Sequence, residues 1–140
     1  MKIVLDTNVL ISGYLFDGKP ERLIKFVKNG LLDLLSTDES IIELERVLRY
    51  KKFKLHNEEI EKILNDYISI SEKILCKIKV DLIKEDVTDN LFLSMGLSGK
   101  ADCIISGDSH ILSMKDNFDI PILTVSEFFE ISDIDLMFLE

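Results

Sequence analysis

The stretch MKIVLDTNVLISG (residues 1–13) raises the first question about the fold. Its apolar run, residues 3–5, stops at Asp6, and a second apolar run follows at residues 9–11 after only two more polar residues. A short apolar run closed by turn-forming residues predicts a buried strand over residues 2–5. Asp6 then has two possible roles, because it can cap the helix that follows or belong to a functional site at the end of the strand.

The same alternation continues along the chain. The pattern predicts strands over residues 2–5, 31–35, 78–80, 103–106 and 121–125. It predicts helices over residues 20–30, 39–50, 58–75, 89–97, 109–114 and 127–131, with Gly96 and Gly99 expected to end the fourth of these. The strands are apolar runs instead of polar and apolar residues in alternation, which indicates a parallel sheet buried on both faces. We therefore expect an α/β fold with one domain over residues 1–130 and a tail of unassigned role over residues 131–140.

Composition limits the class of protein. A chain of 140 residues suits a single domain, and 46% apolar residues suffice for a hydrophobic core. No apolar run approaches the ~20 residues of a membrane span, and we expect no signal peptide. Cys76 and Cys103 lie far apart and form no zinc-binding spacing. These features predict a cytoplasmic protein that does not associate with membranes.

The charge is unevenly distributed. Residues 1–70 carry 11 Lys or Arg and 12 Asp or Glu, whereas residues 71–140 carry 6 and 14, and the net charge is −9. Such an acidic chain repels nucleic acid at long range unless it has a local basic patch or a bound metal. The stretch RVLRYKKFK offers one candidate patch, consisting of Arg46, Arg49, Lys51, Lys52 and Lys54. A solvated helix end, with cations near the C-terminus, explains these residues equally well.

Acidic residues follow two of the predicted strands. Asp6 follows the first strand, and Asp108 follows the strand over residues 103–106 through a single glycine. Sites in open parallel α/β sheets form beyond the carboxyl ends of the strands, so neighbouring strands would bring these two carboxylates together. Each also precedes helical sequence, and taken singly each is more simply explained as a helix cap.

Asp89 is more difficult to explain as a cap. On a helical wheel it lies within an apolar stripe formed by Phe92, Leu93, Gly96 and Leu97. An unpaired charge buried there is costly, so Asp89 needs a cation, a metal or a capping role. Asp86, in the preceding loop, is close enough in sequence to assist it.

Other polar residues give weaker signals. Glu43 lies at the flank of its helix, and the wheel does not favour it over Glu45. Asp102 begins a strand, which places it at the opposite rim, roughly 13 Å away at about 3.3 Å per residue, and we interpret it as structural. His56 and His110 show no ligand spacing, so we expect them to be surface or capping residues.

A cluster of carboxylates without His or Cys favours a hard cation, Mg²⁺ or Mn²⁺. Such a metal can hold a phosphodiester, generate hydroxide from water and stabilise a leaving oxygen. It would also give this acidic chain a positive point for binding phosphate.

Four stretches in the same order resemble a PIN domain, most closely the VapC-like branch of toxins. They are LDTNVLISGYLF, TDESIIELERVL, DVTDNLFLSMGLSGKADCIISGDSHIL and IPILTVSEFF. The resemblance covers nearly the whole chain and implies a three-layer α/β sandwich. It also implies an acidic quartet that binds Mg²⁺ or Mn²⁺ and cleaves RNA, matched here by Asp6, Glu43, Asp89 and Asp108.

The resemblance extends to supporting residues. Asn8 and Ser106 match small polar residues that hold the acids and the metal's water. Ser106 stands where Thr is common, and the stretch from Asp86 to Asp89 is less acidic than is usual in the family. Neither departure removes a member of the quartet.

The resemblance favours a metal-dependent endoribonuclease that acts as a toxin. The expected partners are an RNA substrate, an antitoxin protein and a second copy of the chain in a homodimer. Within the basic patch, the residues expected to steer the RNA backbone are Arg46, Arg49, Lys51 and Lys52. The alternatives are a PIN-like module that binds RNA or protein without cleavage, and an RNA-processing nuclease outside any toxin system. A receiver domain fails, because Lys100 precedes its strand instead of following it.

Overall fold

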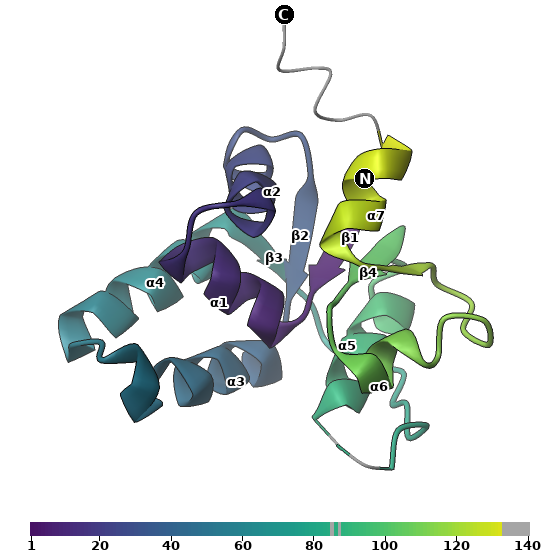
Figure 1. The fold of residues 1–140 in the computed structure, drawn as a ribbon. Coiled ribbons are helices and arrows are strands. Elements are labelled where there is room, and N and C mark those ends of the chain that lie inside the picture. Colours follow the sequence, from purple (N-terminus) through teal and green to yellow (C-terminus); the bar gives the residue numbers. More distant parts are fainter. Residues whose placement is uncertain (85, 87, 133–140) are drawn as a thin grey trace, which may run out of the picture.

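The computed structural model describes residues 1–84, 86 and 88–132 (Figure 1). Its strands are β1 (Lys2–Leu5), β2 (Asp33–Ser36), β3 (Ser71–Lys73), β4 (Cys103–Ile105) and β5 (Ile122–Leu123). Its α-helices are α1 (Thr7–Leu15), α2 (Lys19–Lys28), α3 (Asp38–Leu48), α4 (Asn57–Ile70), α5 (Asp89–Ser98), α6 (Ser109–Leu112) and α7 (Val125–Ser132). A short 3₁₀ helix, η1 (Lys51–Phe53), joins α3 to α4.

The five strands form one parallel sheet in the order β3-β2-β1-β4-β5. β1 lies at its centre, and β4 pairs with it in the register Ile3 with Cys103 and Leu5 with Ile105. The chain order reverses between β1 and β4, which is where open parallel sheets place their sites. The carboxyl ends of β1 and β4 therefore lie side by side at this switch point.

Both faces of the sheet are buried, because successive side chains of a strand point to opposite sides. Ile3 and Leu5 of β1 pack into the larger core, with α1–α4 and α7. Val4, between them, packs into the second core, with α5 and α6. The structure is thus a three-layer α/β sandwich with helices on both faces of the sheet, as predicted (Figure 1).

The edge strand is not where the sequence pattern placed it. β3 occupies Ser71–Lys73, within the helix predicted over residues 58–75, and residues 78–80 form no strand. The Ser71 hydroxyl donates a 2.6 Å hydrogen bond to the Tyr67 carbonyl near the end of α4. The Ile74 N–H donates a 2.8 Å hydrogen bond to the Ser36 carbonyl of β2. β3 is partly to fully exposed, so it lacks the apolar run by which buried strands are found.

Residues 78–80 run along α5 instead of joining the sheet. The Val80 N–H donates 2.9 Å to the Ser94 hydroxyl, and the Ile78 N–H donates 3.0 Å to the Ser98 hydroxyl. Side chains of a neighbouring helix thus satisfy backbone groups that a strand would have satisfied with a sheet partner.

Gly96 lies inside α5 and does not end it. A Cβ atom at this position would lie 2.7 Å from Cδ1 of Ile104, which is on β4. The glycine therefore allows close approach of α5 to the sheet, and the predicted stop at Gly96 is wrong for this packing reason.

The last described helix packs back onto the domain. The ring of Phe129 on α7 lies 5.8 Å from that of Phe26 on α2, edge to face. Most of the tail predicted over residues 131–140 lies outside the described residues. Within the described part of the chain, none of the helices has both the length and the apolar character needed to traverse a bilayer.

Candidate metal centre

Asp6 lies immediately after β1, caps the helix that follows and lines an acidic cleft. Its carboxylate caps α1, because Oδ1 accepts a 2.8 Å hydrogen bond from the Val9 N–H. The residue is 2% exposed, and its second oxygen accepts a hydrogen bond from the Ser106 hydroxyl. Burial raises the pKa of Asp6 above its usual value. Asp6 is thus a cap that also lies in the acidic cluster.

Ser106 links the ends of the two central strands. It follows β4 and is fully buried. Its hydroxyl donates to Asp6 and accepts a 2.9 Å hydrogen bond from the Asp108 N–H. The side chain therefore links Asp6 and the backbone of Asp108.

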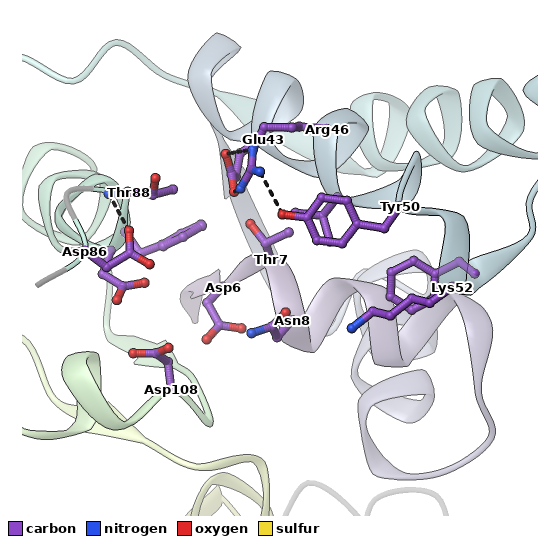
Figure 2. A pocket seen from close by; sticks show the side chains of 14 residues that line it. Asp6, Thr7, Asn8, Glu43, Arg46, Tyr50, Lys52, Asp86, Thr88 and Asp108 are labelled. Carbon is purple, nitrogen blue, oxygen red and sulfur yellow. Dashed lines mark hydrogen bonds and ion pairs between the residues drawn. The ribbon is translucent and has the colours of Figure 1, made fainter.

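Asp108 begins α6. Its Oδ1 accepts hydrogen bonds from the N–H groups of His110, at 2.8 Å, and Ile111, at 3.2 Å. These bonds orient the carboxylate, which lines the same cleft as Asp6 (Figure 2). A carboxylate has about four acceptor positions, so Asp108 keeps capacity for a further ligand.

Asp89, the first residue of α5, is 7% exposed and lines this cleft. Its Oδ2 is buried and accepts no hydrogen bond from any of the described residues. Burial, and after it the nearby Asp108 carboxylate, raise the pKa of Asp89 to about 7. A buried carboxylate oxygen that accepts no hydrogen bond from the described residues, beside other acids, is stabilised as an anion by a nearby cation.

His110, which we expected to be a surface or capping residue, has a side chain that is 43% exposed and lies close to two of the acids. Its Nδ1 lies 3.5 Å from Oδ2 of Asp89 and 3.9 Å from Oδ1 of Asp108. One ligand atom from each of these three residues lies within 4.8 Å of the others. The signal that could have revealed this is local, because a residue two positions after a helix-capping acid lies in the first turn beside it.

Glu43, on α3, lines the cleft from the opposite side to Asp108 (Figure 2). Its carboxylate forms a two-bond ion pair with Arg46, with N–O distances of 2.6 and 3.1 Å. Arg46 also donates 2.7 Å to the Tyr50 hydroxyl. The helical wheel did not favour Glu43, whereas the family resemblance selected it, and the structure places it at the site. Glu45 instead pairs with Arg49 at the surface.

Only two of the four basic residues predicted to steer RNA line the cleft. Arg46 and Lys52 line the cleft, and the Lys52 ammonium lies 5.1 Å from the ring centre of Phe53. Arg49 and Lys51 do not line it, and Arg49 is held by Glu45 and Asn57 with bonds of 2.9 Å each.

Three more residues discussed from the sequence, and one that was not, lie in or near the site or at the opposite rim. Asn8 is exposed at the rim beside Asp6 (Figure 2). Asp86 also lines the cleft. Its Oδ1 accepts a 3.0 Å hydrogen bond from the Thr88 N–H, which shapes the turn before α5. Thr7 was not predicted, and its buried Oγ1 has no hydrogen-bond partner among the described residues. Asp102 accepts a 2.7 Å bond from the Lys2 N–H at the other rim, which confirms its structural role.

The donor set fits a hard divalent cation. The cleft brings together the five carboxylates of Asp6, Glu43, Asp86, Asp89 and Asp108. Oxygen ligands of this kind suit Mg²⁺ and Mn²⁺. Oδ2 of Asp89 is the feature that most favours such an ion, because none of the described residues donates a hydrogen bond to it.

A family model described as a PIN domain matches residues 2–110, a range that includes every acid of the predicted quartet. The chain belongs to the PIN domain family. Among solved structures, this PIN domain is similar to a chain of the VapBC2 complex from Rickettsia felis, crystallised with a DNA fragment from their promoter. The TM-score is 0.61 and the identity 15%, over 87% of this chain and 97% of that chain. At this identity the likeness concerns the fold. No curated protein matches the chain.

Proposed function

We propose that this PIN domain is a divalent-metal-dependent endoribonuclease and acts in the cytoplasm as the toxin of a toxin–antitoxin pair. The observation that carries the proposal is the convergence of Asp6, Glu43, Asp89 and Asp108 on one cleft. These residues come from four separate parts of the chain, since Asp6 and Asp108 precede α1 and α6, and the other two lie on α3 and α5. Helix capping accounts for only some of their carboxylate oxygens. Family membership supports the nuclease assignment, and the similar VapBC2 complex supports the toxin assignment.

Each acid has a role that follows from its surroundings. Asp6, Asp89 and Asp108 are the proposed metal ligands, and Glu43 either joins them or orients the attacking water. Bound Mg²⁺ or Mn²⁺ would supply Lewis-acid activation of that water and charge stabilisation at the phosphate. Ser106 and the backbone amides of α1 and α6 hold Asp6 and Asp108 in position before any substrate binds.

The rim of the cleft supports a single-stranded RNA substrate. Lys52 and Arg46 supply positive charge for phosphate contacts. Tyr50 and Phe53 line the same cleft, and aromatic side chains stack on the splayed bases of unpaired RNA. We include an antitoxin protein and a homodimer among the proposed partners, by analogy with the toxin–antitoxin complex.

The test is cleavage of a mixed RNA pool with Mn²⁺ or Mg²⁺, beside an EDTA control and the Asp6→Asn variant. We expect the wild type to cleave only with metal, and D6N to keep its melting temperature but not to cleave. Full activity of D6N would contradict the mechanism. RNA binding without cleavage, unaffected by metal, would favour a binding module.

The basic rim and the toxin role need separate tests. Lys52→Ala is expected to weaken RNA binding, whereas Lys51→Ala, outside the cleft, should not. If K51A weakens binding as much as K52A, the cleft is not the RNA path. Induced expression of the wild type should arrest growth, and D6N should not. Cleavage in vitro without growth arrest would indicate an RNA-processing nuclease instead of a toxin.

A further inference from the structure

We infer that His110 is a nitrogen ligand of the metal centre and makes it select Mn²⁺ over Mg²⁺. The inference rests on the proposed metal-dependent function and adds a ligand and a metal preference to it. Neither the acidic quartet nor the family match assigns a role to this residue.

The first argument is position. His110 lies in the first turn of α6, and its Nδ1 is 3.5 Å from Asp89 Oδ2 and 3.9 Å from Asp108 Oδ1. Octahedral ligands about 2.1 Å from a cation lie about 3 Å apart when adjacent and about 4 Å apart when opposite. Two of the three pairs of atoms lie between these two spacings, and ligand atoms of all three residues lie within 4.8 Å of one another. The three side chains can therefore bind one ion if they move closer together.

The second argument is that one of these atoms has no other protein partner. Asp89 Oδ2 is buried and accepts no hydrogen bond within the described ranges. Asp89 itself is 7% exposed, so water has little access to it. A cation between Asp89, Asp108 and His110 would coordinate this oxygen. The histidine alone does not satisfy it, because its Nδ1 lies 3.5 Å away and donates no hydrogen bond to it.

The third argument is the ligand type. Mg²⁺ binds oxygen ligands almost exclusively and keeps several waters. Imidazole suits first-row transition ions, and Mn²⁺ accepts carboxylates as readily as Mg²⁺ does. A site with several carboxylates and one imidazole therefore favours Mn²⁺, while an all-carboxylate site discriminates much less between the two ions.

A competing explanation makes the opposite prediction. If His110 is protonated and serves only as a cation that pairs with Asp89, it repels a metal ion. Its removal would then tighten metal binding. If it is a ligand, its removal weakens Mn²⁺ binding, so the sign of the change separates the two explanations.

The chain offers a clean experiment, because it contains only two histidines. His56 is exposed at the start of α4, where its N–H donates 2.9 Å to Glu59 Oε1, and it does not line the acidic cleft. Pulsed electron paramagnetic resonance of the Mn²⁺-loaded protein detects a directly bound nitrogen. The samples are wild type, wild type with ¹⁵N-histidine, His110→Ala, His110→Asp and the matched control His56→Ala. Calorimetry gives the Mn²⁺ and Mg²⁺ affinities of each.

We expect a nitrogen signal in wild type and H56A that changes to the ¹⁵N pattern on labelling and is lost in H110A and H110D. We expect H110A to lose about 10-fold or more in Mn²⁺ affinity, because even outer-shell partners of metal sites contribute about 10- to 100-fold. Mg²⁺ affinity should fall much less. H110D should keep Mn²⁺ binding but lose the preference over Mg²⁺.

Two results would overturn the inference and leave the nuclease proposal intact. They are Mn²⁺ binding by wild type without a histidine nitrogen signal, and tighter Mn²⁺ binding by H110A. A wild type that binds neither ion would overturn both proposals. The labelled wild type needs no substitution, so the test holds even if a variant fails to fold.

Discussion

The acids at the strand ends and the acids on the flanking helices are held in different ways. Asp6 and Asp108 each accept backbone N–H bonds at the start of a helix, and Ser106 joins them. Asp89 has a buried oxygen that accepts no hydrogen bond within the described ranges, and Glu43 is held by the exposed cation Arg46.

This difference separates two ways of building one site. The strand-end acids are placed by bonds that also start helices, so folding alone fixes them. The helix-borne acids are placed by packing of α3 and α5. Arg46 balances the charge of Glu43, whereas a buried oxygen of Asp89 accepts no hydrogen bond from the described residues. A metal ion should therefore change the state of the helix-borne acids more than that of the strand-end acids.

The largest expected effect distinguishes two roles of the Asp108 carboxylate, that of a proposed metal ligand and that of the N-cap of α6. Asp108→Asn and Asp108→Ala should both lower metal-dependent RNA cleavage by about 100-fold or more, beyond the about 10- to 100-fold of an outer-shell change. Only D108A should also lower the melting temperature, because loss of an N-cap costs about 0.5–2 kcal/mol. Cleavage assays and thermal unfolding measure the two effects. Equal destabilisation by both variants would mean that the carboxylate does more than cap α6.

The next effect tests the link between the two strand-end acids. Ser106→Ala should lower Mn²⁺ affinity by about 10- to 100-fold, because the hydroxyl that orients Asp6 is lost. Ser106→Thr keeps the hydroxyl and serves as the matched control. Calorimetric titration measures both variants. Wild-type affinity in S106A would show that backbone bonds alone hold Asp6.

A third prediction uses the unbalanced charge of Asp89. Its folded-state pKa of about 7 lies above the ordinary value of 3.8, so the folded chain binds this proton more tightly than the unfolded chain. The free energy of unfolding of the metal-free protein should therefore rise as the pH falls from 7 towards 4.

Asp89→Asn removes the contribution of Asp89 to this pH dependence and tests its sign, while Asp6, whose pKa is also raised, keeps its own contribution. In EDTA at pH 8 the variant should melt several degrees higher than wild type, and the difference should vanish below about pH 4. With Mn²⁺ present, wild type should gain stability and D89N should gain little. A lower melting temperature for D89N in EDTA would contradict the assignment of Asp89 as an uncompensated charge.

The smallest expected effect concerns Glu43. Arg46→Ala frees this carboxylate and should tighten Mn²⁺ binding by only about 2- to 5-fold, because a solvent-exposed ion pair is weak. The same change should weaken RNA binding. Arg49→Ala is the matched control, since Arg49 pairs with Glu45 away from the cleft. Weaker Mn²⁺ binding in R46A would indicate that Arg46 positions Glu43 for the metal.

The sequence alone predicted the parallel α/β sandwich and the strand-end acids. Buried parallel strands appear as apolar runs, and the residue after such a run lies at the sheet edge where sites form. Asp6 and Asp108 could be found this way because their position depends only on local sequence. The edge strand β3 escaped this reasoning, since a solvated edge has no apolar run.

Only the tertiary structure decided which side chains share the cleft. Glu43 carries no distinctive local pattern, and its place in the cleft depends on how α3 packs against α1 and α5. His110 follows a capping acid, but only the packing of α6 near α5 brings its ring to Asp89. The same holds for Gly96, whose missing Cβ matters only because Ile104 lies against it. Periodicity records whether a residue faces the core, but distances between elements far apart in sequence are set by packing of the whole domain.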